Sequence, residues 1–370
     1  MRLKTILLIV AVAMAHSVPP GTLFCQEASY SMDDYYSVEK IDIHVHIHTE
    51  NTDFVTLTKR DHFRFVNISV QSTEDPIVME QRLRTTLLQY RANADLIAPV
   101  SSFSMTGWEE PDWQEKTIHH LDETFAAGAI GVKIWKNIGM VARDVKGNYI
   151  MIDDLKFDPI IAHIEKCGKV LVGHLGEPKN CWLSLSEMTV KNDYKYFQEN
   201  PQYYMFLHPE MPSYQEQIDA RDRMLSKHPQ VTFVAAHLAS LEWSVDEIAD
   251  FLDRFPNAVV ETAARICHLQ YQTQQDRAKV ISFLIKYQDR VLYGTDLGVG
   301  PDDPTVAIYE KAHTTWERDW EYFNTENMIT VPELDAPVQG LALPREVVEK
   351  LYSKNAKRIF SRSWRSTPSQ

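Results

Sequence analysis

Cysteine is scarce in this sequence, with four residues in a chain of 370. Cys25 stands close to the N-terminus, and the remaining three are an odd number without the close spacing of a disulfide framework. A chain of this length buries a large core and needs no such cross-links. We therefore expect Cys167, Cys181 and Cys267 to be buried or half-buried free thiols.

Basic residues are also few relative to acidic ones. The chain has 38 Lys and Arg against 51 Asp and Glu, so its formal net charge is -13 at pH 7. Affinity for nucleic acid comes largely from basic side chains that neutralise phosphates. The charge balance therefore excludes nucleic acid as the expected partner.

An apolar run long enough to span a bilayer is lacking as well. The run over residues 6–15 follows two basic residues, precedes Pro-Pro-Gly at 19–21, and is too short for a stable membrane span. We interpret residues 1–26 as a secretory signal peptide, although the sequence does not determine where it is cleaved. We therefore expect export to the periplasm or the extracellular space. Lipid anchoring at Cys25 is less favoured, because Phe24 stands where a small residue is usual.

Internal repeats and low-complexity tracts are missing, but short β-rich runs alternate regularly with amphipathic helical stretches. This alternation predicts a parallel sheet. An open doubly wound sheet is the alternative, but the glycine-rich phosphate turn that it would need after its first strand is lacking. Eight strands match the size of one closed (β/α)8 TIM barrel. The predicted strands cover residues 41–48, 63–70, 96–103, 129–136, 169–177, 231–240, 258–265 and 291–298.

Two segments exceed the short loops of a minimal barrel. Residues 178–212 follow the fifth predicted strand and residues 299–342 follow the eighth. Both leave the carboxyl ends of strands, where barrels carry their chemistry, so we expect them to form walls or lids of a pocket. The link between the first two strands is too short for a full helix. We predict a single, somewhat distorted barrel domain over residues 40–361.

The first strand, IDIHVHIH, alternates polar and apolar residues. Strict alternation places Asp42, His44, His46 and His48 on one face, with the apolar side chains on the face that helices cover. Two imidazoles at the end of one strand can grip a single cation. A row of histidines on an exposed edge strand is the alternative interpretation.

Later strands each end in a polar residue after an apolar run. These residues are Lys133, His174, His237 and Asp296. One such histidine alone is more often a hydrogen-bonded core residue than a ligand. Barrel closure brings the strand ends together, however, and the combined nitrogen and oxygen donors are those that Zn²⁺ or a similar divalent ion accepts.

At this point the sequence resembles the amidohydrolase superfamily, in particular its amidohydrolase-related subgroup of metal-dependent barrel hydrolases and decarboxylases. The resemblance covers residues 40–361. It depends on the DIHVHIH opening, on the order and context of His174, His237 and Asp296, and on the closing segment LPREVVEKLYSKNAKRIF. The combination is far more specific than any of its parts.

The resemblance implies roles for particular residues. It makes His44, His46, His174 and Asp296 the ligands of one divalent ion, with Zn²⁺ favoured, and it makes His237 a catalytic residue. Lys133 stays ambiguous. In relatives with two ions a lysine on this strand becomes a carbamate that bridges both metals, whereas in others it binds substrate or packs.

The resemblance also implies a reaction. A divalent cation lowers the pKa of bound water toward about 7, so metal-activated water can attack an ester, lactone or amide carbonyl of a small molecule. Asp296 would accept the proton of this water, and His237 would orient it or polarise the developing oxyanion. The alternative is a metal-dependent, non-oxidative decarboxylase of an unsaturated or aromatic acid. A non-catalytic ligand-binding barrel is the third interpretation.

Several further residues are candidates for contact with the substrate. Arg265 suits a substrate carboxylate, because its planar guanidinium can pair with two oxygens, but an ion pair with Glu261 or Asp296 explains it equally well. The sequence leaves a homo-oligomer open. The candidate substrate-binding residues are Trp135, Asn137, Glu177, His208 and Arg265.

Overall fold

The computed structural model describes residues 29–70, 75–361, 363 and 364. The predicted signal peptide and Cys25 lie outside these residues. Within the described part of the chain, none of the helices combines the length and the apolar character that a membrane crossing requires.

The core of the molecule is a nine-stranded sheet in which every neighbouring pair is parallel. Its order is β8-β7-β6-β5-β4-β3-β2-β1-β9, so each strand from β1 to β8 lies beside its neighbour in the sequence. Each of the eight predicted runs overlaps a strand, so the predicted number and order of strand segments are confirmed. The strands are β1 (Lys40–Ile47), β2 (Phe63–Ile68), β3 (Ile97–Ser102), β4 (Gly131–Ile134), β5 (Val170–Gly173), β6 (Phe233–Ala235), β7 (Ala258–Glu261), β8 (Val291–Leu292) and β9 (Leu297–Val299).

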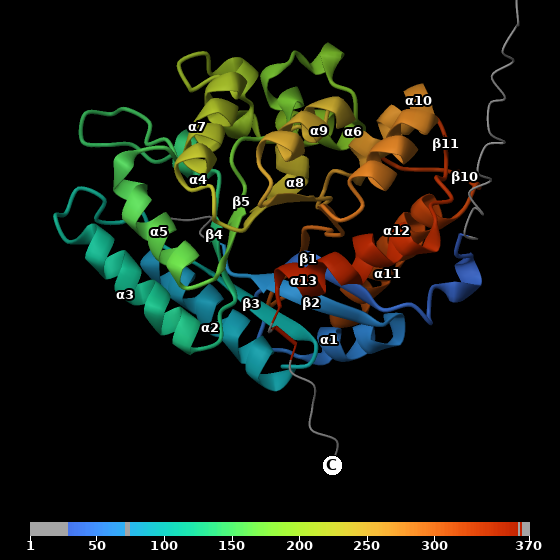
Figure 1. Ribbon diagram of the computed structural model, residues 1–370, viewed down its shortest axis with the longest axis horizontal. Helices are drawn as coiled ribbons and strands as arrows, with labels where there is room; N and C mark the ends of the chain where they lie inside the picture. Colours follow the sequence, from blue (N-terminus) through green and yellow to red (C-terminus); the bar gives the residue numbers. More distant parts are fainter. Residues whose placement is uncertain (1–28, 71–74, 362, 365–370) are drawn as a thin grey trace, which may run out of the picture.

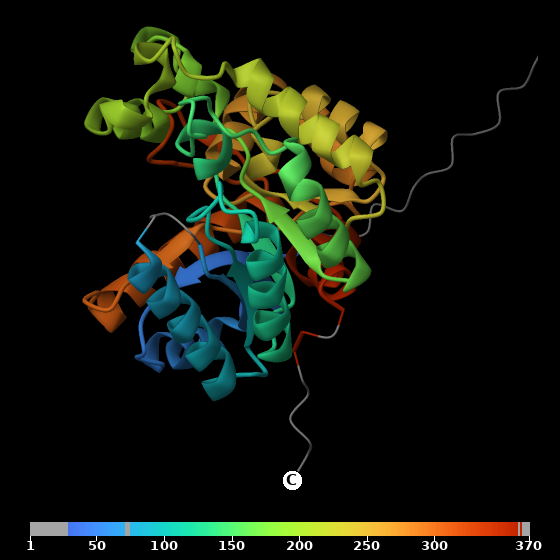
Figure 2. The same cartoon turned by 90° about the vertical axis from the view of Figure 1, so that its left-hand side faces the viewer.

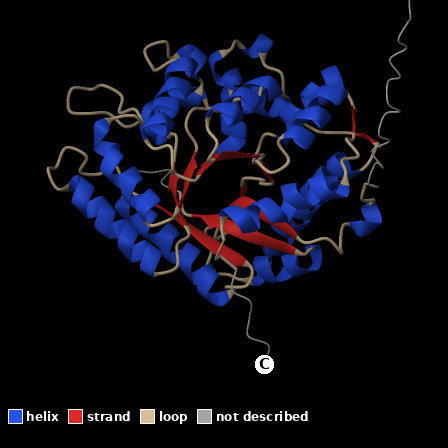
Figure 3. Ribbon diagram, in the orientation of Figure 1, coloured by secondary structure: helices blue, strands red, loops and turns tan. Residues whose placement is uncertain are grey.

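The two ends of the sheet meet at β8 and β9, which follow each other closely in the sequence. β8 pairs with β7, whereas β9 pairs with β1. Between them the N–H of Ile43 donates to the carbonyl of Tyr293, and the N–H of Asp296 donates to the carbonyl of His44. These bonds join the first and last strands into a distorted (β/α)8 barrel, with the strands at the centre and the helices outside (Figure 3). The predicted fold class is thus confirmed.

Helices follow the strands and cover the outside of the sheet (Figure 1). The link between β1 and β2 holds a six-residue α-helix and a 3-10 turn but no full-length helix, as its length predicts. The closing segment contains a π-helical turn over Lys350–Lys354. The α-helices are α1 (Asp53–Thr58), α2 (Pro76–Ala92), α3 (Trp113–Ala126), α4 (Asn137–Met140), α5 (Asp158–Lys166), α6 (Lys191–Glu199), α7 (Tyr214–Lys227), α8 (Ala236–Ala239), α9 (Val245–Arg254), α10 (Ile266–Lys286), α11 (Thr305–Asn324), α12 (Arg345–Glu349) and α13 (Asn355–Ile359).

Strict alternation in the first strand is wrong. Ile41 and Ile43 pack inside the barrel with the inward residues of β2, β3, β5 and β6. Val45 and Ile47 instead belong to the core between the sheet and the helices. The register of β1 against β2 shifts between Asp42 and Val45, and this irregularity moves the following side chains to the opposite face. Asp42 is therefore not part of the histidine face.

The two long segments contain structure of their own. Residues 178–212 include α6 and several short 3-10 helices, and Figure 2 shows this yellow-green part of the chain protruding from one side of the molecule. Residues 299–342 include α11, which buries Trp316 and Trp320, and the antiparallel pair β10 (Met328–Ile329) and β11 (Val338–Gln339). Their expected role as pocket walls stays a prediction.

Candidate metal centre

The candidate metal ligands stand at the carboxyl ends of strands that meet at one end of the barrel. His44 and His46 belong to β1, and Asp296 lies between β8 and β9. Oδ1 of Asp296 is 3.1 Å from Nε2 of His46 and 3.5 Å from Nε2 of His44. The three donor atoms lie within 4.8 Å of one another, so they can contact one ion.

His174 and His237 extend this group. They follow β5 and β6, and Nε2 of His237 lies 3.1 Å from Nδ1 of His174. The ring centroid of His237 is 4.9 Å from that of His44. The structure therefore gathers the predicted ligands around His237, but His174 reaches the group of His44, His46 and Asp296 only through His237.

In three of these imidazoles, Nδ1 points away from the centre and lies within hydrogen-bond distance of an acceptor oxygen. A carbonyl or carboxylate oxygen only accepts, so Nδ1 carries the hydrogen and Nε2 presents its lone pair. Metal-binding histidines have this arrangement, so the donor set and its tautomers fit a divalent cation. The N···O pairs are His44 with Oε1 of Glu261 (2.8 Å), His46 with the carbonyl of Ile68 (2.9 Å) and His237 with the carbonyl of Ala263 (2.9 Å).

Burial sets the charge of the centre. It lowers the pKa of His174 to about 4 and holds the pKa values of His44 and His237 well below their usual value. Burial alone would raise the pKa of Asp296, but His44 and His46 hold it well below the usual range. Neutral imidazoles and an ionised carboxylate are the forms that bind metal ions.

Glu261 supports the candidate centre, although the sequence suggested it only as a partner of Arg265. It ends β7 and is fully buried. Its Oε1 accepts hydrogen bonds from Nδ1 of His44 and from the main-chain N–H of His237, and its Oε2 accepts one from the N–H of Ala263. A single carboxylate thus orients His44 and fixes the turn that carries His237. The available signal was an acidic residue at the end of the apolar run AVVE.

Lys133 lies inside the barrel, against His44. It is buried in β4, and its Nζ is 3.2 Å from Nε2 of His44. Burial lowers the pKa of Lys133 to about 8, while Glu261 and Asp296 oppose this shift. An ammonium at this nitrogen competes with a cation, so Lys133 must turn away or lose its charge when an ion binds there. A bridging carbamate stays one prediction for this residue, and substrate binding stays the other.

A buried group of charges borders His174 on its other side. Lys136 donates a hydrogen bond to Oε1 of Glu177. Oε2 of Glu177 lies 3.6 Å from Nε2 of His174 and 3.9 Å from Nη2 of Arg265. Burial alone would raise the pKa of Glu177, but Lys136 and His174 hold it well below the usual range. Glu177 is therefore an anion that connects the histidines to two buried cations.

Arg265 is buried but only loosely paired. It is 9% exposed, and the carboxylate oxygens of Glu177 and Asp193 each stand 3.9 Å from its guanidinium. Within the described structure its Nε has no hydrogen-bond partner. The alternative prediction, an ion pair of Arg265 with Glu261 or Asp296, is wrong, because its guanidinium pairs with Glu177 and Asp193 instead.

The other candidate substrate residues occupy different places. Trp135 is half-buried and lines a cavity of about 270 Å³ together with Lys136. Asn137 is buried at the first position of α4. His208 bonds within its own segment, where its Nε2 lies 2.9 Å from the carbonyl of Pro201. Contact of these residues with a substrate stays a prediction.

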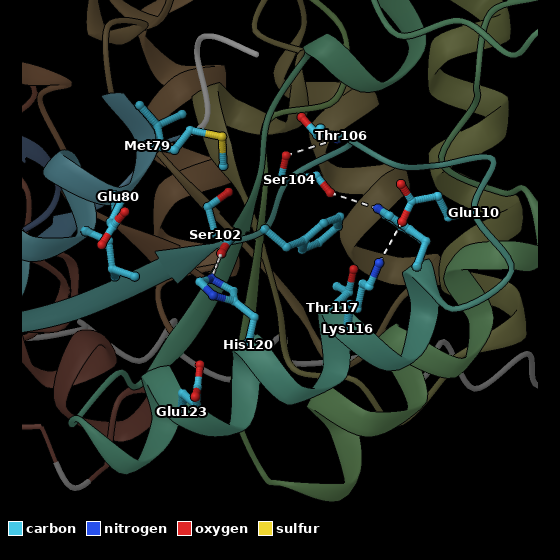
Figure 4. A pocket seen from close by; sticks show the side chains of 15 residues that line it. Met79, Glu80, Ser102, Ser104, Thr106, Glu110, Lys116, Thr117, His120 and Glu123 are labelled. Carbon is cyan, nitrogen blue, oxygen red and sulfur yellow. Dashed lines mark hydrogen bonds and ion pairs between the residues drawn. The ribbon is translucent and has the colours of Figure 1, made fainter. Parts of the chain in front are cut away.

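A cavity of about 490 Å³ lies between α2 and α3 at the ends of β2 and β3. Figure 4 shows the ring of His120 directed at Ser102, with Glu110 and Lys116 paired on another side. Its lining includes neither the candidate ligands nor Lys133. This cavity is therefore separate from the candidate centre.

Of the candidate ligands, Asp296 is the one that borders a cavity shared with α11. Asp296 lines a smaller cavity of about 200 Å³ with Lys311 and Thr315 of α11. The side chains of His46 and Asp296 are 17% and 32% exposed, whereas His44 and His237 are buried. A small ligand would meet His46 and Asp296 first.

Parallel strands that carry histidines and an aspartate at one end of a barrel define a metal-dependent barrel enzyme. A sequence model of the family described as Amidohydrolase matches residues 41–362. The chain belongs to this amidohydrolase family, as the resemblance implied. A search of curated proteins gave no match.

Solved structures of low sequence identity are similar to this chain. The 2,6-dihydroxybenzoate decarboxylase from Rhizobium is 13% identical, covers 88% of this chain and 99% of its own, and has a TM-score of 0.50. The 5-carboxyvanillate decarboxylase from Sphingomonas paucimobilis is 14% identical over 88% and 99%, with a TM-score of 0.45. The 4-oxalomesaconate hydratase from Rhodopseudomonas palustris is 12% identical over 87% and 96%, with a TM-score of 0.47. The likeness to the first of these shows the shared fold.

Proposed function

We propose that this protein is a metal-dependent lyase that removes carbon dioxide from an unsaturated or aromatic carboxylic acid. The observation that carries the proposal is the loosely paired, buried guanidinium of Arg265. Burial alone would lower the pKa of Arg265, but Asp193, Glu242 and Glu177 raise it, so the guanidinium is charged, although the oxygens of its ion-pair partners Glu177 and Asp193 stand 3.9 Å away. Besides the hydrogen bond from Nη1 to the carbonyl of Ala264, a ligand carboxylate would supply two close, parallel hydrogen bonds that these partners do not make. Neutral lactones and amides lack this partner. The decarboxylase interpretation therefore moves ahead of the hydrolase interpretation that stood first.

The fold likeness agrees with this choice by analogy only, because one barrel supports many reactions. Residues of this chain supply the arguments about the site. His44, His46 and Asp296 would hold one divalent ion, with Zn²⁺ favoured by the nitrogen and oxygen donors. When bound, that ion supplies the Lewis acidity that stabilises negative charge left on the substrate.

The reaction breaks the bond between the substrate carbon and its carboxyl carbon, and a proton takes the place of the released carbon dioxide. We assign the transfer of this proton to Asp296, which is ionised and would first take the proton from solvent, because its side chain is the most exposed of the candidate ligands at 32% and borders a cavity. Arg265 would bind a substrate carboxylate, and the pair of Lys136 and Glu177 would position its guanidinium. His237 keeps its proposed catalytic role: its Nδ1 bonds the carbonyl of Ala263, and its Nε2 would exchange the contact with Nδ1 of His174 for one with the reacting group.

We also propose that the protein is exported, because residues 1–26 resemble a secretory signal peptide. Its substrates would then be small acids outside the cytoplasm. A homo-oligomer also stays a prediction.

The test is a screen for released carbon dioxide across aromatic and enol acids, with lactones, esters and amides in parallel. We expect carbon dioxide from at least one acid. Arg265→Met should reduce kcat/KM for this acid about 10- to 1,000-fold, mainly through KM, because it removes a charge-assisted pair. Arg277→Met is the matched control, since Arg277 lies on α10, the helix that follows Arg265, and donates to the carbonyls of Gly340 and Leu341. Turnover of lactones or amides without carbon dioxide would restore the hydrolase interpretation.

A further inference from the structure

A second group of metal-binding side chains lies on the outside of the barrel, where α3 and α5 pack side by side (Figure 1). Asp122 projects from α3. His163 lies on α5, and Cys167 follows this helix at its C-cap, four residues after His163. Cys167 is exposed, which corrects the expectation of a buried or half-buried thiol. Positions four apart share one helix face, so the thiol and the imidazole point the same way.

The carboxylate of Asp122 and the thiol of Cys167 both approach Nε2 of His163. Nε2 of His163 is 2.8 Å from Oδ1 of Asp122 and 3.6 Å from Sγ of Cys167. A catalytic thiol needs its carboxylate on the opposite nitrogen of the imidazole, so that the histidine can pass the proton on. Here the carboxylate and the thiol compete for the same nitrogen. The geometry therefore argues against a nucleophilic triad and favours three donors around a shared centre.

The separations also suit coordination. With metal–sulfur bonds of about 2.3 Å and metal–nitrogen bonds of about 2.0 Å, tetrahedral geometry places sulfur and nitrogen roughly 3.5 Å apart. The observed distance between Sγ and Nε2 is 3.6 Å. The carboxylate of Asp122 must move away by about half an ångström to fit the same geometry. Its side chain is 55% exposed, so this movement meets little resistance.

We propose that Asp122, His163 and Cys167 form a second cation site for Zn²⁺ or another borderline or soft divalent ion. A thiolate selects such ions over Mg²⁺ and Ca²⁺, and solvent supplies the fourth ligand at this exposed position. Binding releases the thiol proton of Cys167 to the solvent. The ion joins α3 to α5, so it stabilises the folded protein by an amount that grows with the logarithm of its concentration divided by its dissociation constant.

The sulfur makes this site distinguishable from the barrel centre, whose candidate ligands are nitrogen and oxygen atoms. The test is a Co²⁺ titration of the purified full chain, which follows the thiolate-to-metal charge-transfer absorption. We expect one equivalent of thiolate-bound ion per chain. Cys167→Ala should abolish the absorption. His163→Gln and Asp122→Asn should each weaken binding at least about tenfold, since even indirect partners of metal ligands cost 10- to 100-fold.

His119→Gln is the matched control, because His119 lies on α3 and pairs with Glu123 across one helical turn without a thiol. It should bind like the wild type. The proposal is overturned by a wild type that shows no such absorption, or by an absorption that persists in Cys167→Ala. It is equally overturned when either His163→Gln or Asp122→Asn binds as tightly as the wild type, since the thiol would then act alone.

Discussion

Replacing Glu261 by glutamine tests whether one buried carboxylate prepares the metal centre. Glutamine has nearly the same shape, but one of its two terminal groups donates hydrogen bonds. If the amide oxygen takes the place of Oε1, the amide NH₂ faces the N–H of Ala263. If the amide is reversed, the NH₂ faces Nδ1 of His44 and favours the tautomer with hydrogen on Nε2. Either arrangement leaves a buried donor opposed by another donor, since the reversed NH₂ also faces the main-chain N–H of His237.

A buried donor without an acceptor costs about 1–3 kcal/mol. Loss of a partner behind a metal-binding histidine typically weakens metal affinity about 10- to 100-fold, which corresponds to roughly 1.4–2.7 kcal/mol. We therefore expect Glu261→Gln to raise the metal dissociation constant by this factor. The assay is competition with a chelator of known affinity, combined with elemental analysis of the purified protein.

Glu242→Gln is the control for this experiment. Glu242 is also fully buried, but its Oε1 accepts a hydrogen bond from the main-chain N–H of Lys179, and its charged neighbours include His268 and Arg265 rather than the candidate metal ligands. Its variant should bind metal like the wild type. Thermal unfolding of both metal-free variants separates lost affinity from lost folding. Metal affinity of Glu261→Gln within about twofold of the wild type would refute the argument that Glu261 sets the tautomer of His44.

Three other substitutions test separate parts of the structure. His237→Asn should leave metal content near normal but lower kcat about 100- to 10,000-fold, the usual contribution of a positioned acid or base, and near-normal kcat would contradict its catalytic role. Lys133→Met should keep one divalent ion per chain by elemental analysis, whereas loss of one ion from a wild type that holds two would favour the bridging carbamate. Asp319→Asn should stabilise the protein above pH 7, because burial raises the pKa of Asp319 to about 7 while its carboxylate accepts a hydrogen bond from Tyr293. A carboxyl group with a raised pKa contributes folding stability that is complete below about pH 4 and is lost as the pH rises through about 7. The free energy of unfolding in urea should therefore fall less across this range in the variant than in the wild type, by at most about 4 kcal/mol.

The strands and their chemical ends were readable because they depend on local pattern. Apolar runs that end in His174, His237 or Asp296 mark buried strands whose carboxyl ends meet, and this topology alone gathers the candidate ligands. The family resemblance added the order of the ligands. Neither source specified that His174 contacts the other ligands through His237, because that depends on the positions of whole strands.

The register of β1 was not readable from the sequence. IDIHVHIH alternates without a break, yet the pairing with β2 shifts after Asp42. The carboxylate of Asp42 accepts hydrogen bonds from the N–H and the hydroxyl of Thr295, far along the chain. Such a contact between distant segments outweighs the local alternation.

The strand ends that carry the chemistry also adopt an unfavourable backbone. His237 and Asp296 have φ values of 58° and 66°, in the left-handed region that costs other residues than glycine on the order of 1 kcal/mol each. Glycine would relieve this strain but would remove the imidazole and the carboxylate. The neighbouring strands offset the cost, because the N–H of His237 donates to Glu261 and the N–H of Asp296 donates to the carbonyl of His44. Each of these two strand ends is therefore held by a hydrogen bond to a residue of another strand. The centre can be rigid only after the barrel has closed.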